Sequence, residues 1–125
     1  MRAGRFLQLL AVLAASMPAA AGEPLSGAEI ADAVGGATTS GVNLYGNPYT
    51  VRILEDGTTR GGAGFSDEHQ DTGSWWIEGD SYCRRWQTWL DGQSACFRVS
   101  IADGEVTWVD TATGATVVEA FTPAQ

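Results

Sequence analysis

The sequence predicts a mainly β domain, in which one short N-terminal helix precedes about eight antiparallel strands. The strands are expected to form an up-and-down barrel or a strongly curved sheet. Three observations predict this fold class. The one helical pattern ends at Gly35-Gly36, and no helical period follows it. Short β-rich runs then recur at spacings of about 8–12 residues. Asp-Gly pairs, which favour hairpin turns, separate several of these runs. A meander of eight strands must hide two edges, and closure into a barrel does so.

A secretory signal peptide is predicted at residues 1–21. Two arginines begin this segment, a largely apolar run covers residues 6–17, and small residues at 19–21 precede the expected cleavage site. The apolar run is too short to span a bilayer, which takes about 20 residues. We therefore expect residues 22–125 to form a single exported β domain, periplasmic or secreted, without a membrane span.

The chain is strongly acidic, with 15 acidic and 7 basic residues and a formal charge of −8. Two of the basic residues lie in the predicted signal peptide, so the exported domain is more acidic still. Binding to nucleic acid or to an anionic membrane surface would require the opposite charge, and both are excluded as working hypotheses.

The predicted helix covers residues 27–34. Ser26 and Glu29 have the spacing of a capping box, in which each side chain bonds the backbone amide of the other residue. Ile30, Ala33 and Val34 form a narrow apolar face. Because so short a helix is unstable alone, it must dock on the strands.

The strands are predicted from alternating or β-rich runs bounded by turn residues. They are expected at 37–44, 49–55, 58–65, 74–78, 81–90, 94–102, 105–109 and 115–121, with a polar loop at 66–73. The three glycines and one alanine of residues 61–64 fall inside a strand run, where glycine marks a bulge or bend rather than a phosphate-binding loop.

Cys83 and Cys96 are expected to form a disulfide, because an even pair in an exported chain is typical of one. A two-residue hairpin turn at Asp91-Gly92 would however place the cysteines four residues out of step, beyond disulfide reach. Either the loop is longer, or a bulge shifts the register, or the strand boundary lies elsewhere.

Aromatic residues are the unusual feature of the predicted strands. We assign Trp75, Tyr82, Trp86 and Trp108 to an interior pocket for a small apolar molecule. The alternative is that these rings simply fill the core of a small domain. A second set of side chains is assigned to an outer interaction surface. This set comprises Trp76, Trp89, Arg84, Arg85 and Arg98.

Catalysis is not expected, and neither is a cofactor or a metal. The only histidine, His69, stands in the polar loop without the spacing of a calcium loop or a zinc site. No serine has the surroundings of a nucleophile elbow. The acidic residues available as a catalytic pair sit in or beside turns, where acids are common.

The strings at 72–86 and 96–99, with Leu25-Ser26-Gly27-Ala28-Glu29-Ile30 upstream, resemble a group of small exported proteobacterial proteins of unknown function. Their shared pattern is a Gly-x-Trp strand, a Cys followed by Trp, and a second Cys. Similar chains are sometimes labelled dihydrodipicolinate reductase, an activity against which the missing dinucleotide fingerprint argues. The Gly73-Ser74-Trp75 string also resembles lipocalin-type barrels, which implies a ligand-binding barrel.

Two functions from different classes follow. The first is a non-catalytic periplasmic protein that binds a small apolar ligand or has an accessory role. The alternative is an envelope interaction protein, such as an inhibitor of a basic cell-wall enzyme, whose charge would steer association.

Overall fold

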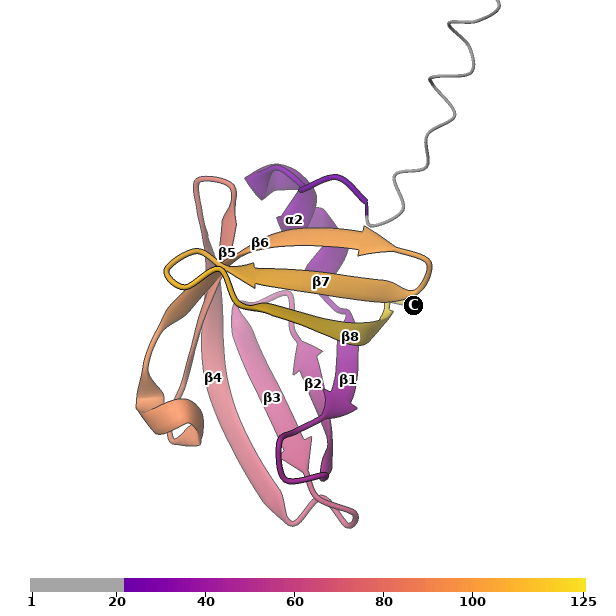
Figure 1. Ribbon diagram of the computed structural model, residues 1–125, viewed down its shortest axis with the longest axis vertical. Coiled ribbons are helices and arrows are strands. Elements are labelled where there is room, and N and C mark those ends of the chain that lie inside the picture. Colours follow the sequence, from indigo (N-terminus) through magenta and orange to yellow (C-terminus); the bar gives the residue numbers. More distant parts are fainter. Residues whose placement is uncertain (1–21) are drawn as a thin grey trace, which may run out of the picture.

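The computed structural model describes residues 22–125, so the predicted signal peptide lies outside the described residues. These residues form one α-helix, α2, and eight strands, β1 to β8 (Figure 1). A short 3-10 helix, η2, follows β5. The bounds are α2 Gly27–Val34, β1 Thr38–Val42, β2 Pro48–Ile53, β3 Thr58–Ala63, β4 His69–Glu78, β5 Ser81–Trp86, η2 Trp89–Gly92, β6 Ala95–Ala102, β7 Glu105–Asp110 and β8 Thr116–Thr122.

The eight strands close into a barrel. Each strand pairs antiparallel with its neighbours in sequence, and β1 pairs with β8 through Thr38–Ser40 and Ala120–Thr122. Closure leaves no free sheet edge, which is the physical reason for preferring it over an open curved sheet. The predicted mainly β fold with eight antiparallel strands is confirmed, and of the two predicted arrangements the barrel is the one observed.

The helix covers one end of the barrel and begins and ends as predicted. Ser26 Oγ accepts from the Glu29 amide at 3.2 Å, and Glu29 Oε1 accepts from the Ser26 amide at 2.8 Å, which completes the capping box. Ile30 and Val34 are fully buried. They pack into a hydrophobic core that is formed mainly by buried strand residues such as Val99. Within residues 22–125, no helix has the length and apolar character needed to cross a membrane.

The prediction of a polar loop at residues 66–73 is wrong for residues 69–73, which belong to a strand. β4 begins at His69, because its first half pairs with β3 from Ala63↔His69 to Thr58↔Ser74. Its second half pairs with β5, from Gly73↔Trp86 to Glu78↔Ser81. A single long strand thus bridges two neighbours, and its polar first half is stabilised by backbone pairing rather than by apolar side chains.

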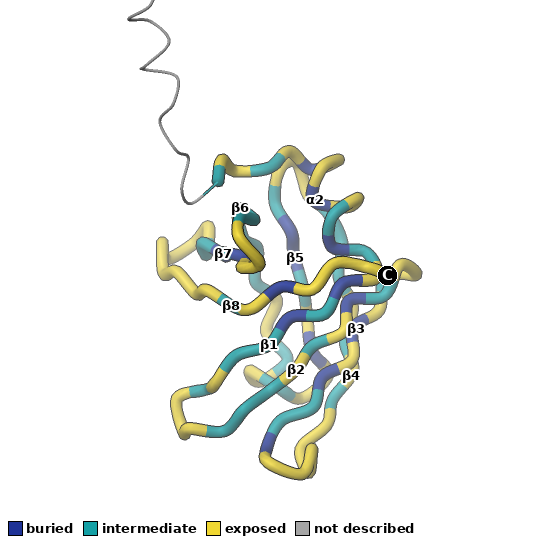
Figure 2. The backbone as a smooth tube through the Cα atoms, turned by 90° about the vertical axis from the view of Figure 1, so that its right-hand side faces the viewer, coloured by how far each residue is buried: buried dark blue, intermediate teal, exposed yellow. Residues whose placement is uncertain are grey.

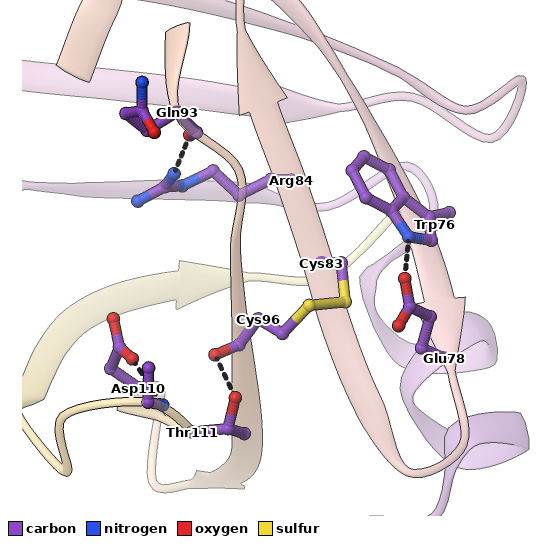
Figure 3. The surroundings of a disulfide bond; sticks show 9 residues. Trp76, Glu78, Cys83, Arg84, Gln93, Cys96, Asp110 and Thr111 are labelled. Atoms are coloured by element: carbon purple, nitrogen blue, oxygen red, sulfur yellow. Dashed lines mark hydrogen bonds between the residues drawn. A yellow bond between two sulfur atoms is a disulfide. The ribbon is translucent and has the colours of Figure 1, made fainter. Parts of the chain in front are cut away.

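The disulfide is confirmed, with Cα atoms 4.0 Å apart (Figure 3). Cys83 pairs directly with Cys96 across β5 and β6. The predicted two-residue turn at Asp91-Gly92 is therefore wrong, and the alternative of a longer loop is confirmed. The last paired residues of β5 and β6 are Arg84 and Ala95, so residues 85–94 separate them, and Leu90 and Asp91 have positive φ, near 55°, within this longer connection. The predicted strand 81–90 accordingly ends at Trp86.

Candidate ligand-binding cavity

A cavity of about 740 Å³ occupies the barrel interior and opens at the end opposite α2. Its lining comes from inward-facing positions of the strands and from the loops at the open end. Figure 1 shows α2 at one end of the barrel and the β1–β2 and β3–β4 loops at the other. The lining residues are Thr39, Asn43, Leu44, Tyr45, Asn47, Tyr49, Val51, Ile53, Ala63, His69, Tyr82, Arg84, Trp86, Trp89, Leu90, Phe97, Trp108, Val117 and Glu119.

Three of the four residues predicted for the pocket line this cavity: Tyr82, Trp86 and Trp108. Tyr82 and Trp108 are buried, and their ring centroids lie 4.8 Å apart. Trp75 is not in the lining. Its ring stacks on that of Tyr82 with the centroids 5.7 Å apart, and its indole N–H donates to the Leu54 carbonyl at 2.8 Å. Trp75 therefore packs against Tyr82 and holds its ring in place without contacting the cavity.

Trp89 lines the cavity as well, although the sequence assigned it to the outer surface. Its ring lies 4.7 Å from that of Trp86. A Cβ atom at Gly61 would collide with the Trp89 ring, so glycine at this position of β3 makes room for the pair. The backbone amide of Trp89 donates to Asp71 Oδ2 at 2.8 Å, which fixes the start of η2. The residue stands after the end of β5, where strand alternation no longer determines its direction.

The other residues of the predicted interaction surface do not form one patch. Trp76 lies on β4 opposite Cys83 and donates to Glu78 Oε2 at 2.7 Å (Figure 3). Arg85 and Arg98 are exposed, on β5 and β6. Arg85 is the better anchored of the two, since it donates to the Gly92 carbonyl at 2.9 Å. Arg84 faces the opposite way from Arg85 and lines the cavity.

A carboxylate, Glu119, also faces the interior, and the sequence reasoning missed it. It accepts hydrogen bonds from the Tyr49 hydroxyl and from the Trp108 indole N–H, the second at 2.8 Å. Burial, together with this bond to Glu119, raises the pKa of Tyr49 well above its usual range. The signal was available in principle, because Glu119 is two positions from buried Phe121 on β8 and therefore shares its inward face.

Arg84 is the cation of the cavity. It is half-buried, and its guanidinium lies over the Phe97 ring at 5.1 Å from the centroid. Nη1 donates to the Gln93 carbonyl at 3.5 Å, on the side away from Trp76 (Figure 3). Burial lowers the pKa of Arg84, an effect opposed by the interaction with Tyr82 and by the charges of Asp110 and Glu119. Burial also raises the pKa of the neighbouring Tyr82 hydroxyl.

Exposed apolar side chains stand at the open end of the barrel, and we call them the rim: Leu44, Tyr45 and Leu90 line the cavity, and Phe65 lies in the β3–β4 loop. Leu44 is 98% exposed, Tyr45 88% and Phe65 81%. Figure 2 shows the β1–β2 and β3–β4 loops as exposed segments at the end away from α2. Large apolar side chains gathered around one opening are unusual for a monomer surface and indicate contact with an apolar molecule or partner.

The candidate metal ligands among residues 22–125 do not make a metal centre. The one group of three that lies close enough together is Glu78, Cys83 and Cys96, and both sulfur atoms are committed to the disulfide. His69 is the first residue of β4 and lines the cavity near its mouth, so it does not stand in the predicted polar loop.

The fold and the cavity thus define a closed eight-stranded barrel with an internal site open at one end. In comparisons with known proteins, no family model, no curated protein and no solved structure matches the chain. The resemblance to small exported proteins therefore stays a prediction.

Proposed function

We propose that the protein is a non-catalytic, lipocalin-like carrier or sensor that holds one small, largely apolar molecule inside its barrel. The observation that carries the proposal is the cavity of about 740 Å³. Sites for small molecules usually span about 300–1,000 Å³ and are lined mainly by apolar and aromatic side chains with a few polar groups. The lining here has that composition, with Trp86, Trp89, Phe97 and Trp108 around Arg84 and Glu119.

The proposed place of action is the periplasm or the extracellular space. The predicted signal peptide supports export. The Cys83–Cys96 disulfide is consistent with an oxidising compartment. Such a protein would meet apolar molecules in the aqueous space outside the cytoplasmic membrane, and an internal cavity would shield them from water.

The proposal is tested by filling the cavity. Val51 lines it from β2, while its neighbour Thr50 is exposed on the outside of the same strand. N-phenyl-1-naphthylamine, a neutral fluorescent probe, is expected to bind the wild-type protein with increased emission. Val51→Trp should weaken this binding by about tenfold or more, because the added ring occupies the site; a tenfold loss corresponds to about 1.4 kcal/mol.

The matched control is Thr50→Trp, which adds the same ring outside the barrel and should leave the probe's dissociation constant unchanged. Thermal melts of both variants establish that each is folded at the temperature of the titration. Equal binding by the wild type and both variants would mean that the probe sits on the outer surface, and would contradict the proposal.

A second candidate function is supported by the rim. Leu44, Tyr45 and Phe65 project into solvent, which suits docking onto another protein, and the acidic charge suits a basic envelope enzyme such as a lysozyme. The two functions are separated by a triple Leu44→Ser, Tyr45→Ser, Phe65→Ser variant. The binding proposal expects no inhibition of lysozyme by the wild type. Inhibition that the triple variant abolishes would favour the interaction function instead.

A further inference from the structure

We propose that the molecule held in the barrel carries an anionic head group, a carboxylate or a sulfonate, and that Arg84 and Tyr82 bind it. This inference rests on the proposed binding function and names the chemical class of its ligand. Both residues lie on β5, two positions apart, so their side chains project to the same side of the strand, into the cavity.

The first step is the unsatisfied hydrogen-bonding capacity of Arg84. A guanidinium has five N–H donors and is always charged in proteins. Within the part of the chain that the structure describes, Arg84 makes one hydrogen bond, the long one to the Gln93 carbonyl at 3.5 Å, and no ion pair. Its contact with Phe97 covers a flat face of the group and leaves the N–H edge free for an acceptor.

The second step is that the nearby carboxylates form their hydrogen bonds with groups other than Arg84. Glu119 accepts from Tyr49 through one oxygen and from Trp108 through the other. Asp110 Oδ1 accepts from the backbone amides of Ala112 and Thr113, at 2.8 and 3.1 Å, in the β7–β8 turn. Both acids influence Arg84 through space, but neither supplies the direct acceptor that a half-buried guanidinium needs.

The third step is the Tyr82 hydroxyl. Among residues 22–125, no protein group forms a hydrogen bond with it, and although most of the residue is buried, the hydroxyl is not one of the buried polar atoms, so it is accessible from the cavity. Its ring is held between Trp75, stacked at 5.7 Å, and Trp108 at 4.8 Å, so the hydroxyl is fixed in direction. A tyrosine hydroxyl that faces a cavity is available to donate to a bound molecule. An anionic oxygen placed beside Arg84 would provide acceptors for both groups.

The apolar part of the ligand would fill the rest of the cavity. Trp86 and Trp89 form a tilted aromatic pair between the cation and the mouth, and Leu90 continues the apolar lining outward. The arrangement fits an amphiphile whose charged end lies inside and whose apolar body extends toward the rim. A cationic head group fits less well, because both oxygens of Glu119 already accept hydrogen bonds.

The test compares two probes that differ by one group. 8-Anilinonaphthalene-1-sulfonate has the skeleton of N-phenyl-1-naphthylamine with an added sulfonate. Arg84→Met should raise the dissociation constant of the sulfonate about 10–100-fold, the usual effect of losing a hydrogen bond to a charged group. The same variant should change binding of the neutral probe by less than about threefold. Tyr82→Phe should act in the same direction with a smaller effect.

Arg85→Met is the matched control, because it removes the same charge from the next residue, on the outer face of β5. It should leave both probes unaffected, which separates local recognition from a change in net charge. Equal weakening of both probes by Arg84→Met, or no change in either, would overturn the anion assignment while the binding function stands. If neither probe binds the folded wild-type protein, the binding function itself fails.

A second measurement uses the wild type alone, so it holds even if Arg84→Met does not fold. Decanoate and decyltrimethylammonium, each below its micelle-forming concentration, compete with the neutral probe. Decanoate is expected to displace the probe at lower concentration, despite the acidic net charge of the protein. Stronger displacement by the cationic competitor would contradict the inference and point to Glu119 as the recognition group.

Discussion

Replacing Ile30 by Ala is expected to lower the free energy of unfolding by about 2–5 kcal/mol, the usual cost of removing a large buried aliphatic group. Ile30 has 0% exposure and joins the helix to the core formed by strand residues such as Val99, Val106 and Phe121. The helix has eight residues, too few for stability on its own, so its docking depends on the few side chains of its buried face. Since small domains have a net stability of only about 5–15 kcal/mol, this loss is large.

The free energies are measured by urea denaturation followed by tryptophan fluorescence. Ile30→Val, which removes one methyl group, should cost about 1 kcal/mol. Asp32→Ala changes an exposed position of the same helix and should stay within about 0.5 kcal/mol of the wild type. A loss below 1 kcal/mol for Ile30→Ala would mean that the helix is not an integral part of the barrel core.

Removing the disulfide with the double change Cys83→Ala and Cys96→Ala is expected to cost about 3 kcal/mol. The bond closes a loop with a sequence separation of 13, and the cost is the loop-closure entropy returned to the unfolded chain. For a domain of this size the melting temperature should fall by about 15 °C. Calorimetry or thermal circular dichroism measures the shift.

Reduction of the wild-type protein provides the control, and it should produce the same fall without any substitution. The disulfide faces away from the cavity, since Cys83 and Cys96 alternate with the lining residues Tyr82, Arg84 and Phe97. Binding of the neutral probe by the folded double variant should therefore be unchanged. Loss of probe binding at a temperature where the variant is folded would contradict the assigned orientation of the hairpin.

Local sequence signals predicted the helix and most strand positions. The capping box of Ser26 and Glu29 involves residues three apart, so its geometry depends little on the rest of the chain. The first half of β4 was missed because residues such as Gln70 and Asp71 are polar, and their strand conformation depends on pairing with the neighbouring strand β3. Such non-local pairing leaves no periodic signal in the sequence.

The hairpin register failed for a related reason. An Asp-Gly pair usually marks a two-residue turn. Here Leu90 takes a positive φ as well, and Asp71, on β4, accepts hydrogen bonds from the amides of Thr88 and Trp89 at 2.8 Å. The loop conformation is thus stabilised by a residue from another strand, which the hairpin sequence alone does not contain.

The interior aromatics were predictable because Tyr82 and Trp86 share one face of a strand. Arg84 has the same parity, so the signal for its inward direction was present, yet an arginine is ordinarily expected at the surface. The same applies to Glu119. Arg84 and Glu119 are therefore exceptions to the rule that charged residues lie at the surface. Because both line the cavity, an inward-facing charged residue on a strand indicates where the binding site lies.

The most direct test of the proposed binding function is a titration of ¹⁵N-labelled protein with N-phenyl-1-naphthylamine, followed through the indole N–H signals of the five tryptophans. Single Trp→Phe variants assign the signals. Binding inside the barrel predicts that the signals of Trp86, Trp89 and Trp108 shift, while that of Trp76, on the outer face, does not. A shift confined to Trp76, or no shift at all at saturating probe, would contradict an internal binding site.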